Sequence, residues 1–199
     1  YYAAQTISPI KDEHGAISHY VSVSKDVTAL VTHTRELRQQ AYHDALTGLL
    51  NRRAGETQLQ LCSQNAQMRQ SHYALILCDI DNFKQVNDRF GHETGDHVLQ
   101  RCASLLSASV RSGDTVVRWG GEEFLIILPD CPPSAALDLA ERIRSTVASH
   151  DDPVIGGFTI SLGVATSETI EDHTALLRKA DSALYACKRS GRNQALIAA

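Results

Sequence analysis

Two adjacent glycines between apolar runs are the feature that most constrains the fold of this chain. Residues 118–124 read RWGGEEF and lie between the apolar pair Val116-Val117 and the apolar run 125–128. Strand, glycine turn, strand is typical of a β-hairpin, because glycine lets the backbone turn tightly. The tip then carries Glu122 and Glu123, which are poorly placed for packing and well placed to bind a hard cation. An exposed hairpin with solubilising charges explains this motif alone equally well.

Helical and strand patterns alternate from His43 to the end of the chain. Apolar periodicity predicts helices over 52–69, 94–110, 134–149 and 172–189, buried strands over 73–81 and 159–166, and a last strand near Ala195. Gly91 and Gly95 are expected to bracket a loop that leads into the second of these helices. This order predicts an α/β fold, an α+β sandwich whose sheet includes the hairpin.

The first 42 residues have a different pattern. Residues 1–26 predict two β segments around a turn at 12–15, and a lone hairpin is marginal in water, so we expect it to belong to a larger sheet. Apolar or small residues then recur every three or four positions, as in a helical seam. The seam residues are Val27, Leu30, Thr34, Leu37 and Ala41. Either a single amphipathic helix packed on its own domain or a short coiled coil pairing two subunits fits this spacing.

Composition bounds the class of protein. The net charge of −4 gives no electrostatic case for binding nucleic acid or an anionic membrane. Five cysteines form no CxxC pair, which is typical of a reducing compartment, so we expect a cytoplasmic location. No apolar run approaches the ~20 residues of a membrane span. The chain begins at Tyr1, and we interpret it as a fragment of a longer protein that has room for a membrane anchor upstream.

The predicted strand over 73–81 ends in carboxylates. It is apolar on both faces, which places it in the sheet interior, yet Asp79 and Asp81 follow at its end. A bare carboxylate there is costly, and a bound cation offsets the cost. Asp79 with Glu122 would form the kind of carboxylate pair that magnesium binds, if the two strands adjoin. The alternative is that Asp81 or Asn82 caps the N-terminus of a helix.

Two further polar segments have both a functional and a plain interpretation. Asn87 and Asp96 flank the glycine loop and could bond the edge of a guanine base, although turn and capping roles explain such residues as well. Lys188 and Arg189 end the last predicted helix, and Arg192 follows it. Cations are favourable at a helix C-terminus, and they also suit a triphosphate.

Five blocks in order resemble the GGDEF domain family, the diguanylate cyclases. They are DALTGLLNRR at 44–53, the segment 79–96, GGEEF at 120–124, TISLGVA at 159–165, and the stretch from 180 to 193 that ends in GRN. Glu122 replaces the aspartate that gives the family its name and keeps the carboxylate. The resemblance implies a central sheet like that of nucleotide cyclases and polymerase palms, flanked by helices, with the Gly-Gly hairpin protruding.

The resemblance also suggests a domain organisation. The stretch 10–28 is similar to the last two strands of a PAS sensor domain. We therefore expect residues 1–28 to be the C-terminal hairpin of a truncated PAS-like domain, residues 29–42 a helical signalling linker, and residues 43–199 the GGDEF domain.

The family resemblance implies that two GTP molecules condense into cyclic di-GMP with release of pyrophosphate. Each domain would hold one GTP, so a homodimer is implied, with two Mg²⁺ (or Mn²⁺) ions per active site. The implied metal ligands are Asp79, Glu122 and the backbone carbonyl of Ile80, and the implied guanine readers are Asn87 and Asp96.

The family resemblance implies other residues for phosphate binding and for proton transfer. The implied phosphate-binding residues are Phe83, Lys84, Lys188 and Arg192. Glu122 or Glu123 would assist deprotonation of the attacking 3′-hydroxyl, with Lys84 also counted as catalytic; the shares of the two glutamates stay open.

An RxxD segment precedes the hairpin. Arg111 and Asp114 match the family's inhibitory product site, and Arg142 falls where a second arginine helps to bind cyclic di-GMP. The alternative is an exposed helix terminus and turn, because RxxD is short. For the whole chain the rival functions are a catalytically silent receptor for GTP or cyclic di-GMP, a cyclase of other nucleotides, and a pure dimerisation module.

Overall fold

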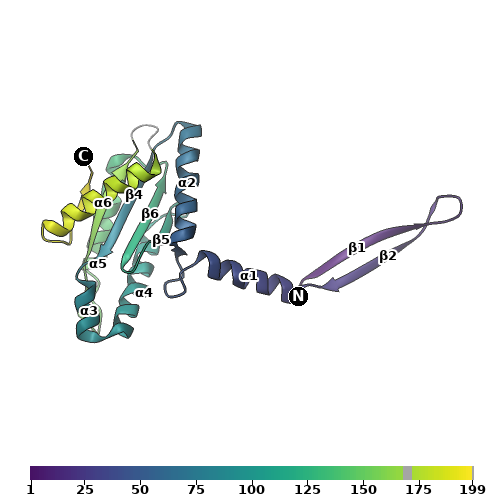
Figure 1. The fold of residues 1–199 in the computed structure, drawn as a ribbon, viewed down its shortest axis with the longest axis horizontal. Helices are drawn as coiled ribbons and strands as arrows, with labels where there is room; N and C mark the ends of the chain where they lie inside the picture. Colours follow the sequence, from purple (N-terminus) through teal and green to yellow (C-terminus); the bar gives the residue numbers. More distant parts are fainter. Residues whose placement is uncertain (168–171, 199) are drawn as a thin grey trace. The chain divides into compact units, whose positions relative to one another are not determined.

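The computed structural model describes residues 1–167 and 172–198, apart from the side chains of residues 36–38 (Figure 1). Leu37 of the predicted seam therefore lies outside the described side chains. The chain forms two compact units, Tyr1–Ala41 and Tyr42–Ala199.

The first unit is an antiparallel hairpin followed by a helix. Strands β1 (Ala3–Lys11) and β2 (Ile17–Asp26) pair along their length, which confirms the two predicted β segments. Their turn is held by Asp12, whose Oδ1 accepts the N–H groups of His14 and Ala16, both at 2.9 Å. Helix α1 (Thr28–Tyr42) follows at once, as the change of apolar period predicts.

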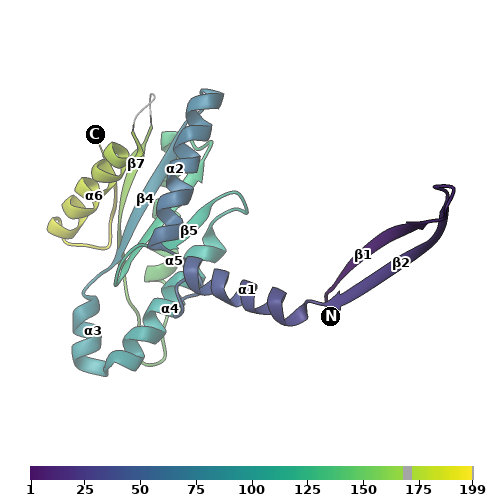
Figure 2. The same cartoon turned by 45° about the vertical axis from the view of Figure 1, so that its right-hand side comes forward.

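The second unit is a six-stranded mixed sheet with helices on both faces (Figures 1 and 2). Its elements are β3 (Leu50–Asn51), α2 (Arg52–Arg69), β4 (Tyr73–Ile80), α3 (Phe83–Phe90), α4 (His92–Ser109), β5 (Thr115–Arg118), β6 (Glu123–Pro129), α5 (Pro133–Ala148), β7 (Ile160–Thr166), α6 (His173–Arg189) and β8 (Ala195–Ile197). The strand order is β3-β5-β6-β4-β7-β8, in which β4 pairs antiparallel with both β6 and β7. The α/β prediction is confirmed, and β5 and β6 form the predicted hairpin.

Strand β4 separates two apolar layers. All eight of its residues are buried, as its apolar sequence predicts. Ala74, Ile76 and Cys78 contribute to a cluster that includes residues of α4 and α5, whereas Leu75 and Leu77 contribute to one that includes residues of α2 and α6. Because successive strand residues face opposite sides, β4 anchors both layers and fixes the height of the residues at its end.

The structure corrects the prediction for residues 83–96. The sequence does not predict helix α3, and the loop expected between Gly91 and Gly95 is not observed, because α4 begins at His92 and contains Gly95. Only Gly91 breaks the helical path, at φ +88°. Gly95 has another role, because a Cβ there would overlap the side chain of Asn87 on α3, which would then have to move. Close packing of two helices, not a turn, accounts for Gly95.

Two bulk properties concern the described part of the chain. None of its helices is both long and apolar enough to cross a membrane. All five cysteines are buried free thiols, and burial raises the pKa of Cys62 to about 11.

Candidate active site at the end of β4

The end of β4 and the tip of the β5–β6 hairpin lie side by side. Asp79 stands opposite Glu123 in the β4–β6 register, and the N–H of Ile80 donates to the carbonyl of Glu122 at 3.3 Å. The hairpin closes through the carbonyl of Glu123, which accepts the N–H groups of Trp119 at 2.8 Å and Gly120 at 3.2 Å. The two strands therefore adjoin, which is the condition for a carboxylate pair of Asp79 and Glu122.

Asp79 is a buried carboxylate close to two others. Burial raises its pKa, the nearby Glu122 and Glu123 carboxylates raise it further, and the Lys188 ammonium opposes them. Lys188 Nζ lies 2.7 Å from Asp79 Oδ2. A buried carboxylate beside two others calls for positive charge, which Lys188 supplies in part.

The oxygen donors of this site fit a divalent cation whose remaining ligands come from a substrate and water. Among residues 1–167 and 172–198, no three His, Cys, Asp or Glu side chains form a group that could hold a metal. Mg²⁺, however, is usually bound by one or two carboxylates, with phosphate and water as the other ligands. Asp79 and Glu122 match that pattern, because the N–H of Ile80, the residue after Asp79, donates to the carbonyl of Glu122. Burial is the main cause of the raised pKa of Asp79, and a bound cation would offset the cost of that burial.

Asp81 has a different role from Asp79. Its Oδ1 accepts the Ser161 hydroxyl at 2.7 Å, and its Oδ2 accepts the Thr159 hydroxyl at 2.7 Å and the N–H of Asn193 at 3.0 Å. The capping alternative holds in position only: Asn82 is the N-cap residue of α3, but its side chain makes no capping hydrogen bond, and Asp81 does not cap the helix. Asp81 is occupied by neutral donors, which leaves Asp79 as the β4 carboxylate that faces the hairpin.

The predicted guanine readers lie on two packed helices. Asn87 on α3 places its Oδ1 against Gly95, the residue before Asp96 on α4. The ring of Phe83 reaches the same glycine and is buried, whereas Asp96 is exposed. The structure thus brings Asn87 close to the backbone next to Asp96.

The predicted phosphate cations are distributed around this end of the sheet. Lys188, in the last turn of α6, is the one that contacts Asp79. Arg192 belongs to the turn after α6, where its N–H donates to the carbonyl of Cys187 at 3.0 Å, and its side chain is exposed. Lys84 is an exposed residue of α3.

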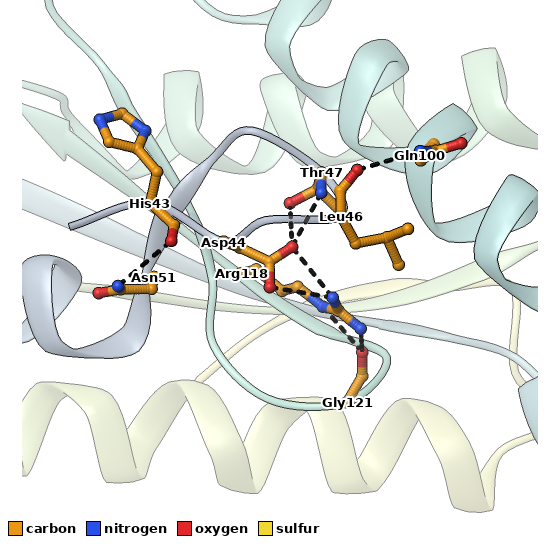
Figure 3. A network of polar contacts seen from close by, with 8 residues as sticks. All are labelled: His43, Asp44, Leu46, Thr47, Asn51, Gln100, Arg118 and Gly121. Atoms are coloured by element: carbon orange, nitrogen blue, oxygen red, sulfur yellow. Dashed lines mark hydrogen bonds and ion pairs between the residues drawn. The ribbon is translucent and has the colours of Figure 1, made fainter. Parts of the chain in front are cut away.

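A polar network that the sequence analysis did not assign holds the hairpin tip (Figure 3). Arg118 Nη1 binds both carboxylate oxygens of Asp44 at 3.0 Å, while its Nε and Nη2 donate to the carbonyl of Gly121 at 3.2 and 2.9 Å. Burial of Asp44 opposes its ionisation, but hydrogen bonds from Thr47 and Arg118 outweigh burial and lower its pKa. Asp44 therefore fixes Arg118, and Arg118 fixes the Gly-Gly turn.

The network extends to α4. Thr47 donates to Asp44 through both its N–H and its hydroxyl, and Gln100 Nε2 donates to the carbonyl of Leu46 at 3.1 Å. Asp44 and Arg118 are 74 positions apart, and each lies in a segment that the sequence analysis singled out. The available signal was Asp44 in the first of these segments and Arg118 in the second, neither of which had a role.

The RxxD segment forms its own ion pair. Arg111 Nε lies 3.0 Å from Asp114 Oδ1, and Arg111 Nη2 donates to the carbonyl of Pro129 at 2.6 Å. Arg142 Nη2 donates to the carbonyl of Ser109 at 2.9 Å, just before this segment. The side chain of Arg111 remains 61% exposed, whereas that of Asp114 is 3% exposed. The three predicted residues thus lie around the junction of α4 and β5.

Comparison with known proteins identifies the family. The profile described as "Diguanylate cyclase, GGDEF domain" matches residues 41–194. The chain belongs to the GGDEF family. It is 43% identical over 177 residues to diguanylate cyclase DgcM of Escherichia coli K12, covering 87% of this chain and 42% of DgcM.

Two other known proteins are similar to this chain. Probable diguanylate cyclase DgcE of E. coli K12 is 36% identical over 197 residues, covering 96% of this chain and 18% of DgcE. The crystal structure of the coiled coil and GGDEF domain of DgcB from Caulobacter crescentus, in complex with c-di-GMP, matches with a TM-score of 0.82 and 34% identity, covering 86% of this chain and 93% of that one. The chain therefore spans less than half the length of DgcM and DgcE, and the family and fold predicted from the sequence are confirmed.

Proposed function

We propose that this chain is the catalytic part of a diguanylate cyclase that condenses two GTP molecules into cyclic di-GMP and releases pyrophosphate. The observation that carries the proposal is the juxtaposition of Asp79 with the Glu122–Glu123 hairpin tip and with Lys188. The names of DgcM and DgcE and the c-di-GMP in the DgcB structure support it.

Asp79, Glu122 and the backbone carbonyl of Ile80 would hold two Mg²⁺ (or Mn²⁺) ions. Bound there, the ions would supply charge stabilisation for the attacking and leaving oxygens. The residues themselves supply position. The β4–β6 pairing holds Asp79 beside the hairpin tip, and the Arg118–Asp44 pair holds the tip against the sheet.

The protein's remaining site residues would bind and orient GTP. Asn87 and Asp96 would read guanine, because an amide and a carboxylate complement its O6 acceptor and its N–H donors. Phe83, Lys84, Lys188 and Arg192 would hold the phosphates. Glu122 or Glu123 would take the proton from the 3′-hydroxyl, with Lys84 assisting catalysis. Positioning and charge stabilisation provide most of the catalysis in phosphoryl transfer.

A homodimer would bring two GTP-loaded domains face to face. Helix α1 is the element suited to pair two copies, since Leu30 in its seam is 67% exposed. The DgcB structure, which contains a coiled coil and a GGDEF domain, supports this role for residues 29–42. Residues 1–28 would then be the end of a PAS-like sensor, and the match to DgcE over 96% of the chain is consistent with an element shared upstream of the GGDEF domain.

Product inhibition would act at Arg111, Asp114 and Arg142. Guanidinium forks suit the phosphates of cyclic di-GMP, and a carboxylate suits guanine. The 61% exposure of the Arg111 side chain leaves it accessible to such a ligand despite its ion pair.

The test is incubation with GTP and Mg²⁺, followed by mass spectrometry of the products. We expect cyclic di-GMP and pyrophosphate, with Glu122→Gln lowering turnover about a hundredfold or more. If the chain makes no product, the assay is repeated with an artificial dimerising helix fused to its N-terminus. If the forced dimer also makes no product yet binds cyclic di-GMP, the chain is a receptor and the proposal is wrong. Competition between GTP and ATP tests the choice of nucleotide.

A further inference from the structure

The turn after α6 has an unusual backbone. Arg192 and Asn193 are consecutive non-glycine residues with φ of +65° and +45°, directly after Gly191 at φ +109°. Side chains disfavour this left-handed region, and residues persist in it where the surrounding structure fixes them. The position of this turn therefore depends on its contacts.

Asn193 is held through both its main chain and its side chain. Its N–H donates to Asp81 Oδ2 at 3.0 Å, and its Oδ1 accepts from Arg144 Nη1 at 3.0 Å. The two contacts come from different elements, since Asp81 follows β4 and Arg144 belongs to α5. One residue thus joins the end of the central strand, a flanking helix and the turn.

Asp81 is a rigid anchor for this turn. It is 6% exposed, and the hydroxyl groups of Thr159 and Ser161 each donate to it at 2.7 Å. Three neutral donors satisfy its charge, so its carboxylate position is fully determined. Asp81 also lies two residues after Asp79, and therefore links the candidate metal carboxylate to the turn that presents Arg192.

Arg144 is oriented from its other side. Its Nε lies 2.7 Å from Glu141 Oε2, and its side chain is 25% exposed. Neither Arg144 nor Asn193 belongs to the residues assigned to substrate, metal or product. The hydrogen bond between Arg144 and Asn193 instead holds the turn after α6 in place.

We infer that Arg144, Asn193 and Asp81 are positioning residues that set the place of Arg192, and through it the binding of the GTP phosphates. The inference rests on the proposed function. The network of Arg144, Asn193 and Asp81 should therefore affect binding of the GTP phosphates and leave binding of guanine unchanged.

The main test compares Arg144→Met with Arg178→Met, which removes the same charge from an exposed position of α6. Arg144→Met should raise the KM for GTP about fivefold with kcat within twofold, and Arg178→Met should change neither. Guanosine, which has no phosphates, should inhibit the wild type and Arg144→Met with the same inhibition constant. Asn193→Gly, which keeps the left-handed backbone permitted and removes Oδ1, should reproduce Arg144→Met.

A double-mutant cycle with Arg192→Ala decides the route. If Arg144 acts through Arg192, then Arg144→Met adds little to Arg192→Ala, whereas independent effects multiply. Three results would each overturn the inference: effects of the two substitutions on KM that multiply, a wild-type KM in Arg144→Met, or a higher inhibition constant for guanosine in that variant. Turnover of GTP in these variants would leave the proposed function intact. No effect of Arg192→Ala itself would remove both the inference and the proposed role of Arg192. Circular dichroism of each variant checks that the fold is retained.

Discussion

The two β-hairpins of this chain share a local geometry and differ in what fixes them. The β1–β2 turn is held by neighbours in sequence, through Asp12 bonds to His14 and Ala16, and both strands are exposed along their length. The β5–β6 turn is held by Arg118, which donates to the carbonyl of Gly121, and Arg118 is itself held by Asp44, 74 positions away. Phe124 and the apolar run that follows it in β6 are buried. A hairpin becomes a platform for chemistry when tertiary contacts determine where its tip lies.

The largest expected effect comes from breaking that tertiary tie. Asp44→Asn removes the charge that orients Arg118, so turnover of GTP should fall about a hundredfold, as is common for groups that orient metal ligands. Asp12→Asn is the matched change in the other hairpin and should leave turnover as it is. Steady-state pyrophosphate release from both variants measures the difference. Equal turnover in the two variants would contradict the comparison.

A second tertiary contact tests the guanine side. Gly95→Ala places a methyl group on Asn87 Oδ1 and should displace the amide, so the KM for GTP should rise by roughly tenfold to thirtyfold. Gly113→Ala is the control, because its added methyl group meets nothing within 4 Å and its φ is not positive. If Gly95→Ala has the wild-type KM, Asn87 does not bind guanine.

The base of the β5–β6 hairpin should behave differently from its tip. Arg111 contacts Pro129 at the far end of β6, so Arg111→Ala should keep turnover while weakening inhibition by cyclic di-GMP about tenfold. Product inhibition curves at fixed GTP give the inhibition constant. Unchanged inhibition would remove the assignment of the RxxD site.

The smallest expected effect is on stability. Burial raises the pKa of Asp79, so between the two pKa values the folded protein binds more protons there than the unfolded chain, and stability falls as pH rises through that interval. Asp79→Asn should therefore raise the Tm of the metal-free protein by about 2 °C near pH 7.

Two conditions sharpen this stability test. The difference in Tm should vanish below the ordinary value of 3.8, where the carboxyl is protonated in both states. Added Mg²⁺ should raise the Tm of the wild type more than that of Asp79→Asn, because only the wild type keeps both metal carboxylates, Asp79 and Glu122. Thermal scans at several pH values with and without Mg²⁺ would show both trends, and a lower Tm for Asp79→Asn at neutral pH would contradict them.

Local pattern predicted most of the elements but not their contacts. The predicted helices and longer strands end within two residues of the observed ones, because apolar periodicity reports directly which face is buried. Helix α3 is not predicted, because it has only eight residues and Gly91 after it is typical of a loop end. The local pattern offers Asp81 as a cap, whereas its partners Thr159, Ser161 and Asn193 lie at least 78 positions away.

The hairpins, the buried strand that ends in Asp79 and the GGDEF family can be predicted from the amino-acid sequence, because turn chemistry, periodicity and ordered motifs depend on neighbouring residues. The choice of charged partners depends on the folded chain. The tertiary structure pairs Lys188 with Asp79, Arg118 with Asp44 and Asn193 with Asp81. The physical reason is that a buried charge is stable only beside specific partners, and sheet order and helix packing select those partners from distant parts of the chain.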